Sequence, residues 1–330
     1  MQVFRDLDAL PTGVRLAATV GVFDGLHRGH LRLLGELVRS AERWHAAPTV
    51  VTFEPHPDAV LHGAPPPLLC DPAERLARLA QAGVAYAVLQ RFDAAFAAQT
   101  PEVFLARLRS GRELAGLVMS PESAIGRGRA GTPERLRELG AAEGFAVDVI
   151  APVDGGGEAI SASRIRQALA RGRIAEARRM LGRDPAVLGT IVRGDARGRL
   201  LGFPTANLAF DATVALPADG IYAVEVSWGG PDPLHPARMA GGVASLGVRP
   251  TFDDDGARVL EVHLFDLDEE LYGERMRVAF VRRQRAERRF ASAEALIAQM
   301  DRDAARARAL LSRRRPRQSV AASLPRSRSV

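Results

Sequence analysis

A ten-residue stretch at positions 21–30, Gly-Val-Phe-Asp-Gly-Leu-His-Arg-Gly-His, constrains the fold of this chain more than any other segment. It follows Val14–Val20, an apolar run with β-branched residues that predicts a buried first strand. It precedes Leu31–Ser40, in which apolar residues recur at helical spacing. Glycine is favoured where a chain turns tightly and its backbone approaches a ligand. The stretch therefore predicts a strand–loop–helix unit that binds a ligand at its loop.

Two histidines in this loop indicate what the ligand is. His27 and His30 are three residues apart, so they share a face if the first helical turn begins there. Imidazoles beside a helix N-terminus, whose amides and dipole attract anions, form a site for phosphate. A polar surface turn with two histidines is the alternative. The buried strand and the Gly-x-Phe-Asp-Gly in front of the histidines favour a nucleotide site.

The loop resembles the HxGH signature of the nucleotidyltransferase superfamily, whose members join a nucleoside monophosphate to an acceptor and release pyrophosphate. Its fuller form, Gly-x-Phe-Asp-Gly-x-His-x-Gly-His, is similar to the N-terminal half of the bifunctional riboflavin kinase/FMN adenylyltransferases. The resemblance implies that two catalytic histidines stabilise the α-phosphate of ATP by charge and hydrogen bonds. It also implies that the loop binds the ATP phosphates through Gly21, Phe23, Asp24, Gly25, His27 and His30.

Length and composition bound the class of protein. A chain of 330 residues with 47% hydrophobic and 25% charged residues is long enough for two globular domains. It has no apolar run of the length that a membrane span needs, and its first residues lack the apolar core of a secretory signal. The single cysteine, Cys70, excludes an internal disulfide and fits a reducing compartment. We expect a cytoplasmic protein without a membrane partner, in which Cys70 is an incidental thiol.

The net charge of +6 raises the question of nucleic-acid binding. The chain contains arginine but no lysine, so a compositional bias explains the charge more simply. The arginines are spread along both halves, apart from a Ser/Arg/Pro-rich end at residues 312–330. That end lacks a periodic apolar pattern, so we expect a disordered basic tail and no nucleic-acid partner.

Strands and helices alternate through the first half, which predicts a doubly wound parallel sheet. The expected strands are residues 14–20, 49–53, 86–89, 114–119 and 145–150, and the expected helices are residues 31–40, 71–82, 101–110 and one that begins at 132. The second strand runs into Glu54-Pro55-His56-Pro57, a stiff loop at the edge of the sheet where ligands bind. The family resemblance implies that His56 lies beside the adenylyl-transfer site.

A glycine-rich loop at residues 120–131 permits two interpretations. Gly126, Gly128 and Gly131 match G-x-G-x-x-G, with Asp148 downstream as a possible ribose contact, as in a dinucleotide-binding dehydrogenase. These glycines come too late in the domain for that fingerprint, which belongs to the first βα turn. In the resembled family the segment is Gly-x-Asp-Phe-x-Phe-Gly and forms part of the flavin pocket, which implies that Arg129 lies on the flavin side. This chain departs from that pattern at Ser120, Glu122, Ser123 and Ile125.

A helix that opens at residues 160–166 completes the first expected site. Serine hydroxyls at a helix N-terminus, with an arginine on the first turn, suit a triphosphate, although a plain N-cap has the same pattern. The segment is similar to the family's Ser-Ser-Thr/Ser-Arg-x-Arg element, with Ala162 in place of one serine. The resemblance implies phosphate binding by Ser161, Ser163 and Arg164.

The pattern of apolar and turn residues changes after Gly182-Arg-Asp-Pro185. Short apolar runs separated by Gly, Pro and Asp turns predict an antiparallel barrel, with strands at residues 187–192, 221–227, 239–246, 259–265 and 275–281. A helix from about residue 292 to 311 should pack on it through Leu296, Ile297, Met300 and Leu310. We therefore expect an adenylyltransferase-like domain at 1–183, a kinase domain at 184–311 and the tail at 312–330.

The loop between the first two barrel strands, Gly-x-x-x-Gly followed by Gly-Phe-Pro-Thr-Ala-Asn, is similar to the ATP-binding element of riboflavin kinases. The hard oxygens of Thr205 and Asn207 suit Mg²⁺ bound together with phosphate. The resemblance implies a general base at Glu261, which takes the proton from the ribityl 5′-hydroxyl, and flavin contacts at Arg285 and Glu287. It implies ATP contacts at Gly194, Gly198, Arg199, Gly202, Pro204 and Thr205.

The sequence thus predicts a bifunctional enzyme that needs ATP and Mg²⁺. The barrel would phosphorylate riboflavin to FMN, and the N-terminal domain would adenylylate FMN to FAD with release of pyrophosphate. Two alternatives stay open. One is a riboflavin kinase whose N-terminal domain is inactive or uses another acceptor, because residues 120–125 diverge. The other is a flavin-binding regulator without turnover.

Overall fold

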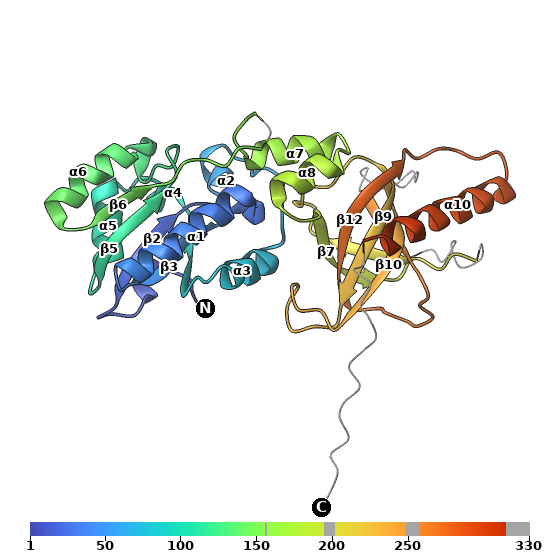
Figure 1. The fold of residues 1–330 in the computed structure, drawn as a ribbon, viewed down its shortest axis with the longest axis horizontal. Helices are drawn as coiled ribbons and strands as arrows, with labels where there is room; N and C mark the ends of the chain where they lie inside the picture. Colours follow the sequence, from blue (N-terminus) through green and yellow to red (C-terminus); the bar gives the residue numbers. More distant parts are fainter. Residues whose placement is uncertain (156, 195–201, 249–257, 315–330) are drawn as a thin grey trace, which may run out of the picture.

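The computed structural model describes residues 1–155, 157–194, 202–248 and 258–314. Two parts lie side by side along its longest axis, an α/β domain and a β-barrel (Figure 1). Some predicted features fall outside the described residues: Gly198, Arg199 and the tail from residue 315 onward.

Within the described residues, six parallel strands form the sheet of the first part, in the order β1-β4-β3-β2-β5-β6. The strands are β1 (Gln2–Phe4), β2 (Arg15–Val20), β3 (Ala47–Glu54), β4 (Tyr86–Arg91), β5 (Glu113–Met119) and β6 (Ala146–Val149). The predicted doubly wound parallel sheet is confirmed. Strand β1 was missed because three residues are too few to show a period. The strand order reverses between β2 and β5, and ligands of open α/β sheets bind at such a point.

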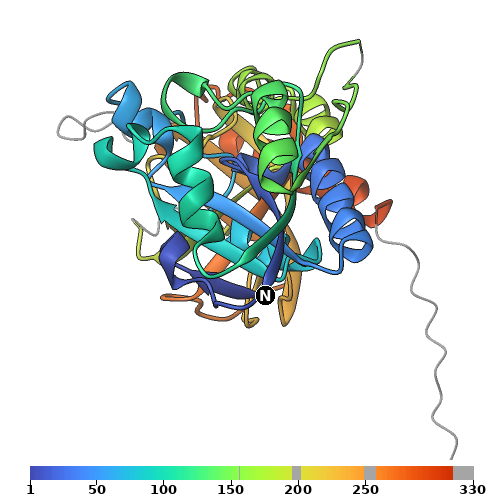
Figure 2. The ribbon, with the colours of Figure 1, turned by 90° about the vertical axis from the view of Figure 1, so that its left-hand side faces the viewer.

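Helices cover both faces of this sheet (Figure 2). They are α1 (Arg28–Arg43), α2 (Pro57–Leu61), α3 (Pro72–Gln81), α4 (Ala94–Ala97), α5 (Pro101–Arg109) and α6 (Pro133–Glu143). Leu34 of α1 and Leu79 of α3 belong to the apolar cluster on one face, and Leu105 of α5 and Leu136 of α6 to that on the other. The predicted start of α3 is confirmed, since the Asp71 side chain accepts a hydrogen bond from the Ala73 amide before Pro72.

Helices α7 (Ala162–Ala170) and α8 (Ile174–Leu181) lie between the sheet and the barrel (Figure 1). Ile165, Leu169 and Met180 share one buried cluster with Tyr222 and Phe280 of the barrel. The helix pair therefore buries its apolar face with the barrel, although the sequence groups it with the first domain. The boundary at residue 183 stays a prediction.

In the second part, six described strands close an antiparallel barrel in the order β10-β11-β8-β7-β12-β9. They are β7 (Ala186–Val192), β8 (Ala206–Phe210), β9 (Gly220–Trp228), β10 (Arg238–Val248), β11 (Arg258–Leu264) and β12 (Arg275–Arg285). The predicted barrel is confirmed. Strand β8 was read from the sequence as part of the nucleotide loop, because its five residues follow directly on that motif.

Helix α10 (Ala293–Ser312) packs on the outside of the barrel against β9 and β10. The sequence predicted this contact for Leu296, Ile297, Met300 and Leu310; Leu310 does pack against the apolar cluster between α10 and the barrel, but none of the four is fully buried. The buried stripe is Gln299, Asp303, Ala307 and Leu311. Two polar residues can be buried there because they are paired: the Gln299 amide donates to Asp303 at 2.8 Å, and Arg285 donates to the other oxygen of Asp303 at 2.8 Å.

Candidate functional sites

The nucleotide loop follows β2 at the point where the strand order reverses. Three residues of this loop have a left-handed backbone: Phe23 (φ +52°), Gly25 (φ +70°) and Leu26 (φ +39°). A Cβ on Gly25 would lie 2.7 Å from the Cβ of Leu69, so only glycine fits there. Helix α1 then begins, and His27 caps it by accepting a hydrogen bond from the His30 amide at 3.3 Å.

The two predicted catalytic histidines lie against each other. Their rings stack with centroids 3.7 Å apart and an interplanar angle of 15°. Burial, with the nearby Arg183 cation, lowers the pKa of His27 to about 4. Burial and His27 hold the pKa of His30 well below its usual range. Without a ligand, both pKa values are thus shifted toward the neutral imidazole, and the expectation that the two rings act on a bound phosphate by charge stays a prediction.

Three arginines, one buried and two largely buried, bring positive charge to this loop from separate parts of the chain. Arg166 of α7 donates to Asp24 at 2.6 Å, Arg75 of α3 donates to the Val22 carbonyl at 3.3 Å, and Arg183 donates to the Gly25 carbonyl at 2.6 Å. Sequence reasoning missed all three as site residues. Their convergence arises from tertiary packing, and the only local signal was the position of Arg166 two residues after Arg164.

Two of the predicted phosphate-binding residues, Phe23 and Asp24, are buried and contact other parts of the protein, and their role toward phosphate stays a prediction. Phe23 is buried in the apolar cluster under α1, and a Cβ on Gly21 would contact its ring at 3.3 Å. Asp24 is 3% exposed and accepts hydrogen bonds from Arg166 and from the Leu69 amide at 2.8 Å. Burial raises the pKa of Asp24, and the Arg166 cation opposes that rise.

The structure brings the second predicted phosphate element to this loop. A Cβ on Gly29 would lie 3.9 Å from the carbonyl oxygen of Ile160, so the N-terminal ends of α1 and α7 are neighbours. Ser161 caps α7 by accepting from the Arg164 amide at 3.3 Å, and Ser163 is exposed on the first turn. The Arg164 side chain donates to the carbonyls of residues 158 and 159 at 2.8 and 2.7 Å. Two helix N-termini therefore converge on one place, which suits a polyphosphate.

The predicted flavin-side residues lie on loops at the same edge of the sheet. His56 follows β3 and caps α2, and its Nδ1 accepts from the Asp58 amide at 3.1 Å. Burial lowers the pKa of His56, and the charges of Asp24 and Arg166 also act on it. Arg129 is exposed and donates to the Glu122 carbonyl.

The divergent segment 120–125 contains a hydrogen bond between two of its own side chains. The hydroxyls of Ser120 and Ser123 lie 2.7 Å apart, and Ile125 is buried in the cluster shared by α5 and α6. Asp148 accepts hydrogen bonds from Ser40 at 2.9 Å and Arg43 at 2.8 Å, near the C-terminal end of α1. Asp148 is therefore held by two side chains of α1.

A single cross-strand row on the barrel holds three of the predicted kinase residues. Its members, each paired with the next in register, are Asn207 on β8, Glu261 on β11, Ser245 on β10, Ile221 on β9 and Arg285 on β12. Their neighbours Leu208, Leu260 and Leu246 are buried in the barrel core. Because side chains alternate along a strand, the row lies on the outer face.

Residues next to this row contact its side chains and help to fix their positions. A Cβ on Gly194 would collide with the Asn207 side chain, which explains a glycine at that position. Glu287 lies beside Gly247 and accepts from the Ser245 hydroxyl at 3.5 Å, and burial raises its pKa. Arg285 is held by Asp303 and stacks over Phe290 at 5.7 Å.

Three other predicted ATP residues of the barrel, Gly202, Pro204 and Thr205, are among the described residues. Pro204 and Thr205 line a cavity of about 380 Å³ together with residues 267–272. The Pro204 carbonyl is 2.9 Å from Nδ1 of His263, and Gly202 has φ +81°. Thr205 directly precedes β8, and Asn207 is the second residue of that strand.

An α/β domain with a glycine- and histidine-containing loop at its switch point, joined to a barrel that carries Glu261 in a polar cross-strand row, is the architecture of a two-domain nucleotide-dependent transferase. Two family models match, FAD synthetase over residues 12–164 and riboflavin kinase over residues 181–311. The bifunctional riboflavin kinase/FMN adenylyltransferase of Escherichia coli (strain K12) is 39% identical over 293 residues, covering 88% of this chain and 91% of the relative. That of Pseudomonas fluorescens is 34% identical over 94% of this chain and 98% of its own length. This chain belongs to the bifunctional riboflavin kinase/FMN adenylyltransferase family.

A solved structure extends the likeness to the arrangement of both domains. It is described as a macrolide-efflux protein from Streptococcus pneumoniae, with a TM-score of 0.83 and 29% identity over 96% of this chain and 99% of that one. Among the described residues, no helix is both long and apolar enough to cross a membrane.

The lowered pKa of His27 predicts a dependence of stability on pH. Between pH 6.5 and 4 the unfolded chain binds a proton that the folded loop excludes, so the free energy of unfolding falls as pH falls through this window. From pH 7 to pH 5 we expect a loss of about 2 kcal/mol. Urea titrations followed by the fluorescence of Trp44, in a Trp228→Phe background, measure it. His27→Asn should reduce this loss and leave the part that comes from His30, and an equal loss in that variant would contradict the assignment.

Proposed function

We propose that each domain carries one step of FAD synthesis, with the residues of each site in defined roles. The barrel transfers the γ-phosphoryl group of ATP to the 5′-hydroxyl of riboflavin and yields FMN and ADP. The α/β domain joins the AMP portion of a second ATP to the phosphate of FMN and yields FAD and pyrophosphate. The observation that supports this proposal is that one chain of this family holds a stacked His27–His30 pair in its α/β domain and Glu261 in register with Asn207 on its barrel.

In the barrel, Glu261 takes the proton of the attacking hydroxyl. Its place in register beside Asn207 supports this role, because the hydroxyl must be deprotonated next to the transferring phosphoryl group. Among the described residues, no group of three or more His, Cys, Asp or Glu is arranged to hold a metal ion. The oxygens of Thr205 and Asn207 are the donors that suit Mg²⁺ bound with phosphate, and Mg²⁺ would neutralise charge on the transferred group.

In the α/β domain, the stacked histidines donate hydrogen bonds to the α-phosphate as charge builds up on it. The amides at the N-termini of α1 and α7 and the hydroxyl of Ser163 hold the remaining phosphates. His56 and Arg129 lie at the same sheet edge and are assigned to the flavin side. Binding of a polyanion next to His27 raises the pKa of its imidazole, so proton uptake should accompany ATP binding near pH 6.

A second candidate, a kinase that stops at FMN, is favoured by the segment 120–125. The segment contains no aromatic residue, and the side chain of Ile125 is buried in the domain core, so the segment offers no aromatic surface for a flavin ring.

We also infer a cytoplasmic location, supported by the single cysteine. Cys70 is buried, and burial raises the pKa of its thiol to about 12.

Incubation of the protein with riboflavin, ATP and Mg²⁺, followed by chromatography of the flavins over time, tests the proposal. We expect FMN first and FAD later, and addition of a chelator should stop both steps. FMN that accumulates without FAD, even when FMN is supplied as the substrate, would support the second candidate. Saturable flavin binding without ATP consumption would contradict both.

A further inference from the structure

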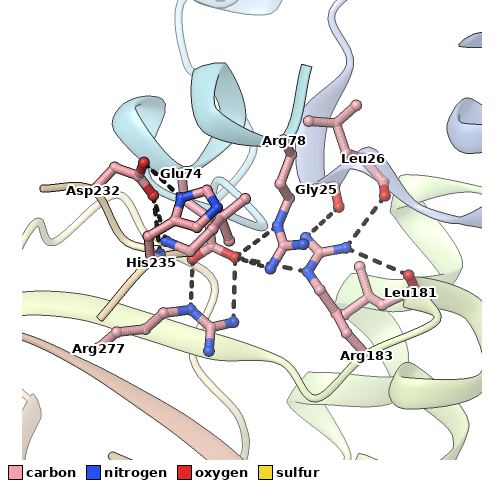
Figure 3. Close-up of polar contacts among 10 residues, drawn as sticks. Gly25, Leu26, Glu74, Arg78, Leu181, Arg183, Asp232, His235 and Arg277 are labelled. Carbon is pink, nitrogen blue, oxygen red and sulfur yellow. Dashed lines mark hydrogen bonds and ion pairs between the residues drawn. The ribbon is translucent and has the colours of Figure 1, made fainter. Parts of the chain in front are cut away.

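A buried ionic cluster joins the α/β domain to the barrel (Figure 3). We call Glu74 and Arg78 of α3, Arg183 after α8 and Arg277 of β12 the interdomain cluster. Arg277 donates to the two oxygens of Glu74 at 3.0 and 3.2 Å, and Arg78 donates to one of them at 2.7 Å. The Arg183 guanidinium lies 3.6 Å from Glu74. The Glu74 side chain is 3% exposed, so water does not screen these contacts.

Arg183 connects this cluster to the nucleotide loop. Its two terminal nitrogens donate to the carbonyls of Gly25 at 2.6 Å and Leu26 at 3.2 Å (Figure 3). These are the two left-handed residues that directly precede His27, and such a backbone is strained at leucine. A strained loop keeps its shape only when its surroundings hold it. The guanidinium fork supplies two of those contacts from outside the loop.

The charges of the cluster explain why its members depend on one another. Although burial opposes its ionisation, Arg277, Arg78 and Arg183 lower the pKa of Glu74 to about 2. Burial lowers the pKa of Arg183 to about 10, so it stays charged at pH 7. A buried cation needs a paired anion, and Glu74 is the carboxylate that the structure places beside Arg183. The barrel orients Glu74 through Arg277.

We propose that Arg183 is a positioning residue for adenylyl transfer, which clamps the carbonyls before His27 and is itself held by Glu74 and the barrel's Arg277. The catalytic loop of one domain is then kept in shape by the docking of the other. The proposal rests on the adenylyltransferase function proposed above. It assigns Arg183 no contact with ATP or flavin.

The first test compares Arg183→Met and Arg183→Lys in the full chain. With FMN and ATP supplied, Arg183→Met should lower kcat for FAD formation by about 10- to 100-fold. Riboflavin phosphorylation by the same preparation should stay unchanged, which shows that the protein is folded. Lysine should restore only part of the rate, because an ammonium group lacks the fork that reaches both carbonyls.

A second readout does not require turnover. Loss of the Arg183 cation removes a charge that lowers the pKa of His27, so this pKa should rise in Arg183→Met when followed by NMR of labelled histidine. If the wild-type protein forms no FAD, the proposed adenylyltransferase function fails, while this titration still decides whether Arg183 acts on the loop. Unchanged FAD formation together with an unchanged pKa of His27 would overturn the inference.

Arg275→Met is a matched control for the contribution of Arg277, the barrel residue of the interdomain cluster. Arg275 lies on the same strand as Arg277 and pairs with Asp71 of the first domain at 3.6 Å, but it is not linked to Arg183. We expect Arg277→Met to slow FAD formation by about three- to tenfold. Arg275→Met should stay within about twofold of the wild type, as for other exposed ion pairs. Equal losses in both variants would point to general loosening of the domains and against the proposed link.

Discussion

Replacing Glu261 with glutamine is expected to lower the rate of riboflavin phosphorylation by about 10²- to 10⁴-fold, the usual contribution of a general base. Glutamine keeps the shape of the side chain and its place opposite Asn207 and Ser245, but it cannot accept the proton of the attacking hydroxyl. The decrease should lie in kcat, with little change in the KM of riboflavin, because the lost interaction exists only in the transition state. Measuring FMN formation at several riboflavin concentrations separates the two.

Two controls make this result specific. The Glu261→Gln protein should still convert added FMN to FAD at the wild-type rate, since that reaction uses the other domain. Glu225→Gln changes a carboxylate on β9, a strand of the same barrel that does not adjoin β11, and should leave both reactions unaffected. A Glu261→Gln variant that phosphorylates riboflavin normally would remove the general-base role and leave the row on the barrel without an assigned chemistry.

Replacing His27 with asparagine is expected to lower the rate of FAD formation from FMN by about 10²- to 10³-fold. Asparagine is a good N-cap and can accept the hydrogen bond that His27 now accepts from the His30 amide, so α1 should still begin at Arg28. What is lost is the imidazole that stacks on His30 and that we propose as a donor to the α-phosphate. Riboflavin phosphorylation should be unchanged, so FMN accumulates in the coupled assay.

His62→Asn is the matched control for this variant. His62 lies at the end of α2 with its side chain 70% exposed, and it should tolerate the same change without loss of either activity. Pyrophosphate release measured with FMN as substrate reports the step directly. Retention of the wild-type rate in His27→Asn would show that the loop binds the nucleotide without help from this imidazole in the transition state.

The divergent segment 120–125 shows that a motif comparison identifies changed side chains but not how the changed loop packs. The sequence showed that two aromatic rings of the family pattern are missing there. The structure adds that Ile125 fills the domain core and that the two serines bond to each other, so the loop is held without those rings. A family pattern records which side chains a site uses, whereas packing determines whether a changed loop keeps its place.

Sequence alone determined most of the architecture, because the periods of apolar residues and the capping residues are local properties. The alternation of strands and helices, the start of α3 at Asp71 and the change to short antiparallel strands were all visible in this way. The motif residues could also be assigned to two separate phosphate sites. Differences arose where local pattern is weak, as in β1, in β8 and in the fully buried positions of α10, where buried pairing of Asp303 with Arg285 outweighs the leucine spacing.

Only the tertiary structure decided the electrostatics of the two sites and the way they are joined. The pKa of His27 falls because of burial and a cation 156 positions away in the sequence, which no local pattern contains. Arg75, Arg166 and Arg183 reach one loop from three elements, and Arg277 reaches Glu74 from the other domain. Charge acts through space rather than along the chain, so these contacts become defined only when the fold brings the elements together.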